Sequence, residues 1–269
     1  MIVLRSSEEI EKMRRAGRLV SEVLDMVVRT AAAGVTTLEL DELAEKMIRD
    51  GGALPAFKGY QPDFIRCGPF PATLCTSLND VVVHGIPDDR PLEEGDLLSV
   101  DTGVVLDGYY GDAAVSVIIG RADPDVRRLV DVTRTALESA IGECRPGNRL
   151  SEVSHAVQEL AEGAGFSVVR RFVGHGIGTE MHEDPPVPNF GEPGNGPVLK
   201  PGMVFAIEPM VNAGGFEVEA SPDRWPVHTK DGSLSAHFEH TVAITGGEPD
   251  VLTRPVGSRL GLEKSVRLE

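Results

Sequence analysis

Asp101 and Asp112 lie in two apolar runs joined by Asp107-Gly108, a dipeptide typical of a two-residue hairpin turn. If this dipeptide forms the turn, Asp101 pairs with Ala114 and Asp112 pairs with Gly103. Because side chains alternate along a strand, both carboxylates then share one face, with Cα atoms about 7–8 Å apart. Buried carboxylates need a partner, so the pair predicts a bound cation. The alternative is two exposed loop aspartates.

Three further side chains extend this set of candidate cation ligands. Glu208 follows the apolar run Met203 to Ile207, and Glu239 begins another apolar run. His175 stands between two glycines, which let the backbone fold closely around an imidazole. Each of these three residues, taken alone, also fits a solvent-exposed position, so the prediction of a cation site depends on the whole set. One imidazole with four carboxylates suits Mn, Fe, Co or Zn, and such a site can hold two ions about 3.5–4 Å apart.

Two more histidines, His84 and His182, are candidates for proton transfer or substrate contact. His84 ends an apolar run that starts at Val81, and His182 follows Met181 in the segment after His175. Imidazole is the side chain most often used as a general acid or base near neutral pH. Each of the two histidines by itself fits a surface position as well as a catalytic one.

Four amphipathic helices and several strands are predicted to position these residues. The first two helices begin with capping boxes, the third with an Asp-Pro pair, and apolar residues recur along the helices at every third or fourth position. Their markers are Ser6 with Glu9, Thr36 with Glu39, Asp123-Pro124, and the segment Ser151 to Ala164. Strands are predicted over Ala72 to Ser77, Val81 to His84, Leu97 to Val105 and Tyr109 to Ile119.

The second and fourth helices open alike, which indicates an internal repeat. The spacing is 113 residues for every member of the motif, which is Gly34, Thr37, Glu39 and Leu40 in one copy and Gly147, Leu150, Glu152 and Val153 in the other. Chance similarity of two amphipathic helices is the alternative. We expect an α+β fold with pseudo-twofold symmetry, in which helices pack on one side of a curved antiparallel sheet. The chain is predicted to be a single catalytic domain, 1–269, with halves at roughly 1–122 and 123–255.

Composition and charge narrow the class of protein. Hydrophobic residues make up 41% of the 269 residues, close to the globular average. The net charge of −16 argues against partners that select Lys and Arg patches, such as nucleic acids and anionic membranes. Cys67, Cys75 and Cys144 form no CxxC pair, and no apolar run is typical of a signal peptide or a membrane span. We therefore expect a cytoplasmic protein.

The motifs around these residues resemble those of type I methionine aminopeptidases, and the similarity runs over nearly the whole chain, roughly Ser6 to Thr253. They are DxG at Asp101, GD at Asp112, GHGIG around His175, a strand ending in IEP at Glu208, and FEHT around Glu239. The resemblance implies the pita-bread fold and removal of the initiator methionine from new chains. It also implies that these five residues bind two divalent metal ions, Co, Mn, Fe or Zn, and that His84 and His182 contact the scissile region.

The resemblance further implies a mechanism of metal-assisted amide hydrolysis. Glu208 would accept the proton of the attacking water, with His84 nearest the scissile amide and His182 nearest the residue after methionine. That residue should therefore be small. The expected partner is the N-terminus of a peptide or nascent chain, with transient association with the ribosome. We expect a monomer that has no nucleic-acid specificity of its own.

A substrate pocket for the methionine side chain is implied as well. Its predicted lining, beside His84 and His182, is Phe70, Cys75, Val83, Met181 and Trp225. Cys75 and Val83 are expected to flank His84 in one strand pair. The chain departs from the usual type I pattern here, because Val83 stands where cysteine is common and Met181 where an aromatic residue is common. His237 stands where glutamine is common, and the stretch Gly59 to Phe70 is long.

Two other functions stay open from the sequence. A proline-directed peptidase, such as prolidase or aminopeptidase P, resembles this chain in the five ligands but usually carries a large N-terminal domain. A non-catalytic pita-bread binding module, of the kind found in some histone chaperones, typically lacks several of the ligands. All five candidate ligands are present in this sequence.

Overall fold

The four predicted helices are present in the computed structural model, which describes residues 1–63 and 65–254. They are α1 (Ser7–Thr30), α2 (Thr37–Asp50), α3 (Pro124–Gly142) and α4 (Leu150–Gly163). Ser6 and Thr36 cap α1 and α2 through complete capping boxes, and the Asp123 side chain caps α3. No helix in this described part is long and apolar enough to cross a bilayer.

The strands of the described residues form three antiparallel sheets. The largest has nine strands and contains, in spatial order, β1 (Leu54–Pro55), β4 (Leu97–Leu106), β5 (Tyr109–Ile118), β14 (Glu239–Ala243), β9 (Val204–Ile207), β7 (Gly174–Gly176) and β8 (Glu183–Val187), with β2 (Cys75–Leu78) beside β4 and β15 (Asp250–Val251) beside β14. The second sheet is β13 (Ser235–His237), β10 (Met210–Asn212) and β6 (Ser167–Val168). The third is β11 (Val218–Glu219), β12 (Val227–Thr229) and β3 (Val81–Val83).

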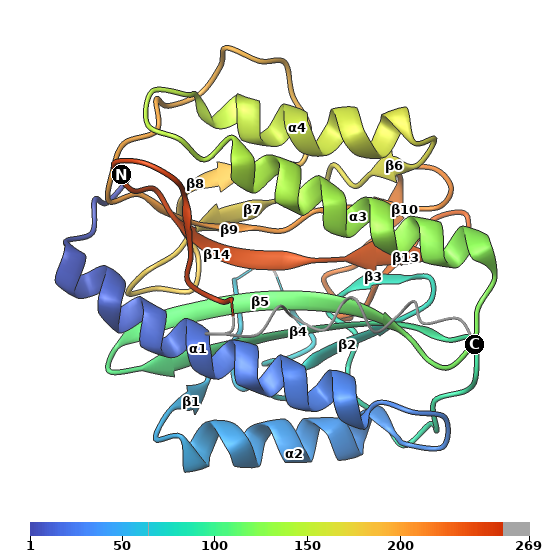
Figure 1. Ribbon diagram of the computed structural model, residues 1–269. Helices are drawn as coiled ribbons and strands as arrows, with labels where there is room; N and C mark the ends of the chain where they lie inside the picture. Colours follow the sequence, from blue (N-terminus) through green and yellow to red (C-terminus); the bar gives the residue numbers. More distant parts are fainter. Residues whose placement is uncertain (64, 255–269) are drawn as a thin grey trace.

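The helices cover one face of the large sheet (Figure 1). Val100 and Val104 of β4 pack into an apolar core with residues of α1 and α2. Phe205 and Ile207 of β9 pack into a second core with residues of α3 and α4. Because side chains alternate along a strand, the intervening residues of β4 and β9 point to the opposite face, away from the helices.

The two helix pairs repeat the same local structure. α2 and α4 each have 14 residues, and each follows a glycine in the left-handed region, Gly34 with φ 92° and Gly147 with φ 95°. The Gly34 N–H donates to the carbonyl of Leu92 (2.8 Å), and the Gly147 N–H donates in the same way to that of Leu199 (3.1 Å). The predicted α+β fold with pseudo-twofold symmetry is confirmed. The boundary between the halves near residue 122 stays a prediction.

The strand predicted from Ala72 begins only at Cys75. The buried Asp41 carboxylate in α2 accepts hydrogen bonds from the N–H groups of Thr73 and Leu74, at 2.9 and 2.7 Å. These two N–H groups are therefore not available to a neighbouring strand, so the sheet cannot extend to Ala72. An acidic side chain far away in the sequence overrides the local strand pattern.

The prediction that Cys75 and Val83 lie in one strand pair is wrong. Cys75 is in β2, which pairs with β4, whereas Val83 is in β3, which pairs with β12 in another sheet. The chain turns between them at Asn79, which has a left-handed φ of 56°. β3 then pairs with β12 in the third sheet, while the N–H of Thr76 in β2 donates to the carbonyl of Gly85, the residue after His84 (2.8 Å).

Candidate metal centre and substrate pocket

The strand register places the five predicted ligands in two adjacent rows across the large sheet. One row contains Asp101 of β4, Ala114 of β5 and Glu239 of β14. Glu208 continues this row, because it follows Ile207, which pairs with His240, the residue after Glu239. The other row is Gly103, Asp112, Thr241, Ala206 and His175, on β4, β5, β14, β9 and β7. Residues opposed across antiparallel strands share a face, so both rows lie away from the helices. The predicted hairpin register of Asp101 and Asp112 is confirmed.

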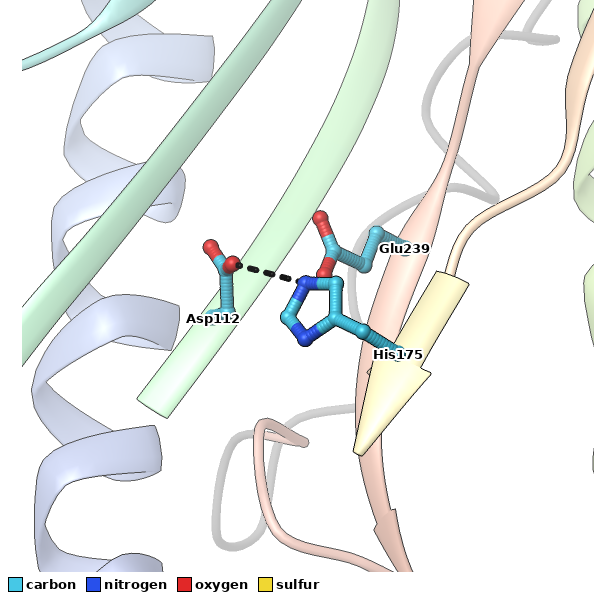
Figure 2. A group of neighbouring side chains, drawn as sticks. All are labelled: Asp112, His175 and Glu239. Carbon is cyan, nitrogen blue, oxygen red and sulfur yellow. Dashed lines mark ion pairs between the residues drawn. The ribbon is translucent and has the colours of Figure 1, made fainter. Parts of the chain in front are cut away.

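The ligand atoms converge although they come from separate strands. His175 Nε2 lies 3.5 Å from Glu208 Oε1 and 4.0 Å from Asp112 Oδ2. One donor atom each of Asp112, His175 and Glu239 lies within 4.8 Å of the other two. Figure 2 shows the carboxylates of Asp112 and Glu239 beside the His175 ring. This spacing suits donor atoms that share a cation.

Gly174 and Gly176 flank His175 because the neighbouring backbone leaves no room for side chains. A Cβ atom at Gly174 would lie 2.3 Å from the carbonyl oxygen of Ala206, and one at Gly176 would lie 2.2 Å from that of Asp184. The Nδ1–H of His175 donates to the carbonyl of Gly176 at 2.9 Å. The lone pair of Nε2 is then free to bind a cation. The expected close backbone packing around this histidine is confirmed.

Burial dominates the electrostatics of the ligands. It is the largest cause of the raised pKa of Asp101, Glu208 and Glu239, and repulsion from Asp112 is the next. Burial also raises the pKa of Asp112 to about 7, and it lowers the pKa of His175 to about 3. Four carboxyl groups thus surround a neutral imidazole, and their negative charges are unfavourable without a positive partner.

Unpaired oxygens show that the set fits a cation. Asp101 Oδ1, Asp112 Oδ1 and Glu239 Oε1 are buried and have no hydrogen-bond partner in the described residues. Buried carboxylates of this kind are stable only when paired or bound to a metal. The five side chains offer carboxylate oxygens and one imidazole nitrogen, which Mn, Fe, Co and Zn all accept. The residues present therefore fit a site for divalent cations.

Two residues that the sequence analysis did not single out hold the ligand backbones. The Thr241 hydroxyl donates to the carbonyl of Asp112 (2.8 Å) and accepts from its N–H (3.1 Å). The Asn189 side chain donates to the carbonyl of Glu208 (3.0 Å). Strand alternation could have found Thr241, because it lies two residues after Glu239 and shares its face. Asn189 lies in a loop and carries no such signal.

His84 contacts two aromatic rings. Phe172 and Trp225 contact its ring edge to face, with centroids 5.6 and 6.0 Å away. Burial lowers the pKa of His84 to about 4, so the ring is neutral near pH 7. Its backbone is in the left-handed region, with φ 61°. A neutral imidazole in this position can donate one hydrogen bond to a substrate and accept another.

His182 lies at the exposed edge of the site. Its ring centroid is 4.4 Å from that of His175, and its Nδ1 is 2.9 Å from the hydroxyl of Tyr60. The next residue, Glu183, forms an ion pair with the buried guanidinium of Arg5. This ion pair fastens the loop that carries His182. Neither Tyr60 nor Arg5 is near a ligand motif in the chain, so no local sequence pattern predicts these two contacts.

An apolar cluster adjoins the ligands and contains three of the predicted pocket residues, Phe70, Cys75 and Trp225. The rings of Phe70 and Trp225 meet edge to face at 5.2 Å, and the Trp225 indole N–H donates to the carbonyl of Gly68 (3.1 Å). Cys75 pairs directly with Asp101 across β2 and β4, so it borders both the ligands and the cluster. The other members of the cluster are Phe57, Tyr60, Ile65 and Ala72.

The two remaining predicted pocket residues lie elsewhere. Val83 packs in a different apolar cluster, together with Val169 and Met210. Met181 is buried, and its methyl group lies close to Gly103 in the second ligand row. Met181 is therefore near the predicted ligands, whereas Val83 belongs to a different apolar cluster from Trp225.

His237 approaches the ligands from the second sheet. Its Nε2 is buried without a hydrogen-bond partner in the described residues and lies 3.9 Å from Glu208 Oε2. The Ser116 hydroxyl accepts from the backbone N–H of His237 (2.9 Å) and donates to its carbonyl (2.8 Å). Burial lowers the pKa of His237 to about 3, so the ring is a neutral neighbour of Glu208.

Known proteins share both the sequence pattern and the fold. The pattern of metallopeptidase family M24 matches residues 11–246, a stretch that includes all five predicted ligands. A methionine aminopeptidase from Clostridium acetobutylicum is 50% identical over 254 residues, covering 94% of this chain and 99% of that protein. The crystal structure of methionine aminopeptidase from Thermotoga maritima has a TM-score of 0.90 and 45% identity, covering 94% of this chain and 100% of that one.

A more distant likeness concerns the fold alone. Prolidase from Pyrococcus furiosus has a TM-score of 0.72 at 23% identity, covering 94% of this chain and 66% of that one. The chain belongs to metallopeptidase family M24, and within that family to the methionine aminopeptidases. The predicted family, enzyme class and pita-bread fold are thus confirmed.

Proposed function

We propose that this enzyme removes the N-terminal methionine of nascent proteins and peptides with the help of two divalent metal ions. The observation that carries the proposal is the convergence of Asp112, Glu208 and Glu239 on His175, with Asp101 in the adjacent row and with buried oxygens that lack a partner among the described residues. Five ligands with four carboxylates are more than a single ion of this kind needs, which favours two ions. Metal analysis of the purified protein tests this, and one ion per chain at full activity would contradict it.

Bound ions would supply Lewis acidity, which activates water and stabilises negative charge on the scissile carbonyl. Glu208 is the candidate proton acceptor, because its carboxylate lies among the predicted ligands, with Oε1 3.5 Å from His175 Nε2. His84 is the candidate hydrogen-bond partner of the scissile amide. His182, at the exposed edge, is the candidate contact for the residue that follows methionine.

The apolar cluster of Phe70, Cys75 and Trp225 is the proposed pocket for the methionine side chain. Its position beside Asp101 supports this, since the α-amine and scissile bond must reach the ligands when the side chain is in the pocket. Met181 is proposed to close the pocket on the side of Gly103. Val83 stays a prediction, because its cluster is a separate one. A small second residue is proposed because the following side chain must pass His182.

A panel of peptide substrates distinguishes the proposed function from that of a proline-directed peptidase. Cleavage of Met-Ala-Ser, Ala-Ala-Ser, Ala-Pro-Ser and Met-Pro should be measured with the metal-loaded enzyme. We expect turnover of Met-Ala-Ser only. Comparable kcat/KM for Met-Ala-Ser and Ala-Pro-Ser would assign the chain to the proline-directed branch. The same assay tests the non-catalytic alternative, because a binding module would cleave none of the four peptides.

The compartment, oligomeric state, ribosome association and metal ions of the enzyme are also proposals. We infer a cytoplasmic monomer that acts on nascent chains and associates transiently with ribosomes, with Mn, Fe, Co or Zn as the ions. The three cysteines are free in the described structure, which agrees with a reducing compartment. Sedimentation of the pure protein tests the monomer, and co-sedimentation with ribosomes tests the association.

A further inference from the structure

Tyr60 forms a hydrogen bond with His182 that the chemistry above does not use. The Tyr60 hydroxyl lies 2.9 Å from His182 Nδ1, and the two ring centroids are 5.4 Å apart. In the described part of the chain, this is the one hydrogen bond of either side chain. A partner on Nδ1 decides which ring nitrogen of a neutral histidine carries the proton.

The chemistry of the two groups favours the Tyr60 hydroxyl as the donor in this contact. Burial raises the pKa of Tyr60 above its ordinary value of 10.0, so the phenol keeps its proton. An imidazole nitrogen with a lone pair is a better acceptor than a phenol oxygen, and no second acceptor for this hydroxyl lies among the described residues. Nδ1 of His182 therefore holds the lone pair, and the proton of the neutral ring is on Nε2.

His175, whose ring centroid is 4.4 Å away, has the opposite arrangement. Its Nδ1–H donates to the carbonyl of Gly176 (2.9 Å), and its Nε2 lone pair lies toward Glu208 Oε1 (3.5 Å). The two neighbouring histidines thus have different partners on Nδ1, a carbonyl acceptor for one and a hydroxyl donor for the other. The first arrangement makes Nε2 a cation ligand, and the second makes Nε2 a hydrogen-bond donor.

We propose that Tyr60 is a positioning residue that fixes His182 in the Nε2–H form, so that His182 offers a donor to the carbonyl groups of the peptide substrate. The inference rests on the proposed function for the identity of the substrate. The same tautomer keeps His182 from competing with His175 for a cation, because a protonated Nε2 has no lone pair. Tyr60 therefore separates a substrate contact from the adjacent metal ligand.

The backbone around Tyr60 is held firmly enough for this role. Its N–H donates to the carbonyl of Phe57 (2.9 Å), and its carbonyl accepts from the N–H of Phe70 (2.8 Å). Phe70 in turn packs against Trp225. Tyr60 and Phe70 are thus hydrogen-bonded to each other, and this bond holds the backbone that carries the Tyr60 hydroxyl.

The tautomer of His182 can be read directly. Zinc-loaded protein labelled with nitrogen-15 histidine, without peptide and at neutral pH, gives long-range proton–nitrogen spectra that distinguish the two tautomers. His182→Asn assigns the signals of His182. We expect the proton of wild-type His182 on Nε2. A proton on Nδ1 would overturn the proposal, whatever the peptide assay shows.

Tyr60→Phe removes the hydroxyl and keeps the ring packing. We expect His182 to become a mixture of tautomers and kcat for Met-Ala-Ser to fall about tenfold, the effect of one hydrogen bond, with zinc content unchanged. Tyr109→Phe is the matched control, since its hydroxyl lies toward Glu9, and should change neither quantity. An unchanged tautomer or an unchanged kcat in Tyr60→Phe contradicts the role. Failure of the proposed function appears separately, as wild-type protein that cleaves no methionyl peptide.

Discussion

Asp101 and Asp112 are held in a buried place where four carboxyl groups and one imidazole meet. Burial disfavours the charged form of each carboxyl group, and this is the largest cause of their raised pKa values. The nearby His175, His84 and His237 are neutral for the same reason. Without a cation, these groups oppose folding at neutral pH.

Asp101→Asn should therefore stabilise the metal-free protein at neutral pH and abolish activity. The folded pKa of Asp101 is raised above 3.8, so its contribution to stability is complete below about pH 4 and is lost as pH rises toward the folded pKa. Asparagine does not ionise, so the variant does not lose stability in this way as the pH rises. Thermal unfolding with chelator should show a difference between the two proteins at neutral pH that shrinks toward about pH 4. Full activity of a metal-loaded variant would disprove the ligand assignment.

His84→Ala should lower kcat by about 10²–10³ without changing metal content, because a hydrogen bond formed mainly in the transition state is lost. His84 has a left-handed φ of 61°, so alanine also introduces backbone strain. His84→Asn is the matched variant, since asparagine tolerates this conformation. Metal content is measured alongside steady-state rates. A loss of metal in parallel with activity would make His84 a ligand instead.

At the scale of elements, strand alternation and close backbone packing arrange the ligands. β4, β5 and β14 each turn one set of alternate residues to the helices and the other set to the ligands. β7 is short and has glycines on both sides of His175, so that it can lie close to β9 and β8. The position of the His175 imidazole depends on the close packing of β7 against β9 and β8.

Gly176→Ala should displace β7 from β8 and weaken metal binding. A Cβ at this position meets the Asp184 carbonyl at 2.2 Å, and backbone cannot yield as a flexible side chain can. Overpacking of this kind costs about 1–3 kcal/mol. Gly163→Ala, at the exposed end of α4 with open space around it, is the control and should stabilise by about 0.5–1 kcal/mol. Equal melting temperatures and metal affinities for the two variants would contradict this account.

At the scale of the molecule, both predicted halves contribute to the site. Asp101 and Asp112 come from β4 and β5, and the other three predicted ligands come from the region after α4. The proposed methionine pocket is assembled in the same way, from the segment around Phe70 and the distant Trp225. Substrate selectivity is therefore a property of the assembled chain.

The enzyme should cleave Met-Ala and Met-Gly peptides and leave Met-Lys and Met-Phe peptides nearly intact. The reason is the position of His182 beside the path of the second residue. At the first position the unbranched norleucine should be accepted and its branched isomer leucine disfavoured by about 1–3 kcal/mol, the usual range of discrimination in an apolar pocket. kcat/KM across this series is the measurement. Similar values for Met-Ala and Met-Phe peptides would remove the proposed role of His182 in selectivity.

Local pattern was enough to predict a large part of this protein. The capping boxes at Ser6 and Thr36 predicted where α1 and α2 begin, because a cap acts within one helical turn. The Asp107-Gly108 turn predicted the register of Asp101 with Ala114, because strand alternation follows directly from a two-residue turn. The motifs around the five ligands predicted the family, since each motif is a short run of neighbouring residues.

Other features were decided only by tertiary structure. Asp41 shortens β2, Val83 packs in a different apolar cluster from Trp225, Tyr60 contacts His182, and His237 lies close to Glu208. In each case the residues in contact are distant in the sequence. Local periodicity predicts which residues are exposed or apolar, but it does not predict which of them contact each other. Such contacts depend on how whole sheets and loops pack, and that packing is settled by the burial of side chains from all parts of the chain together.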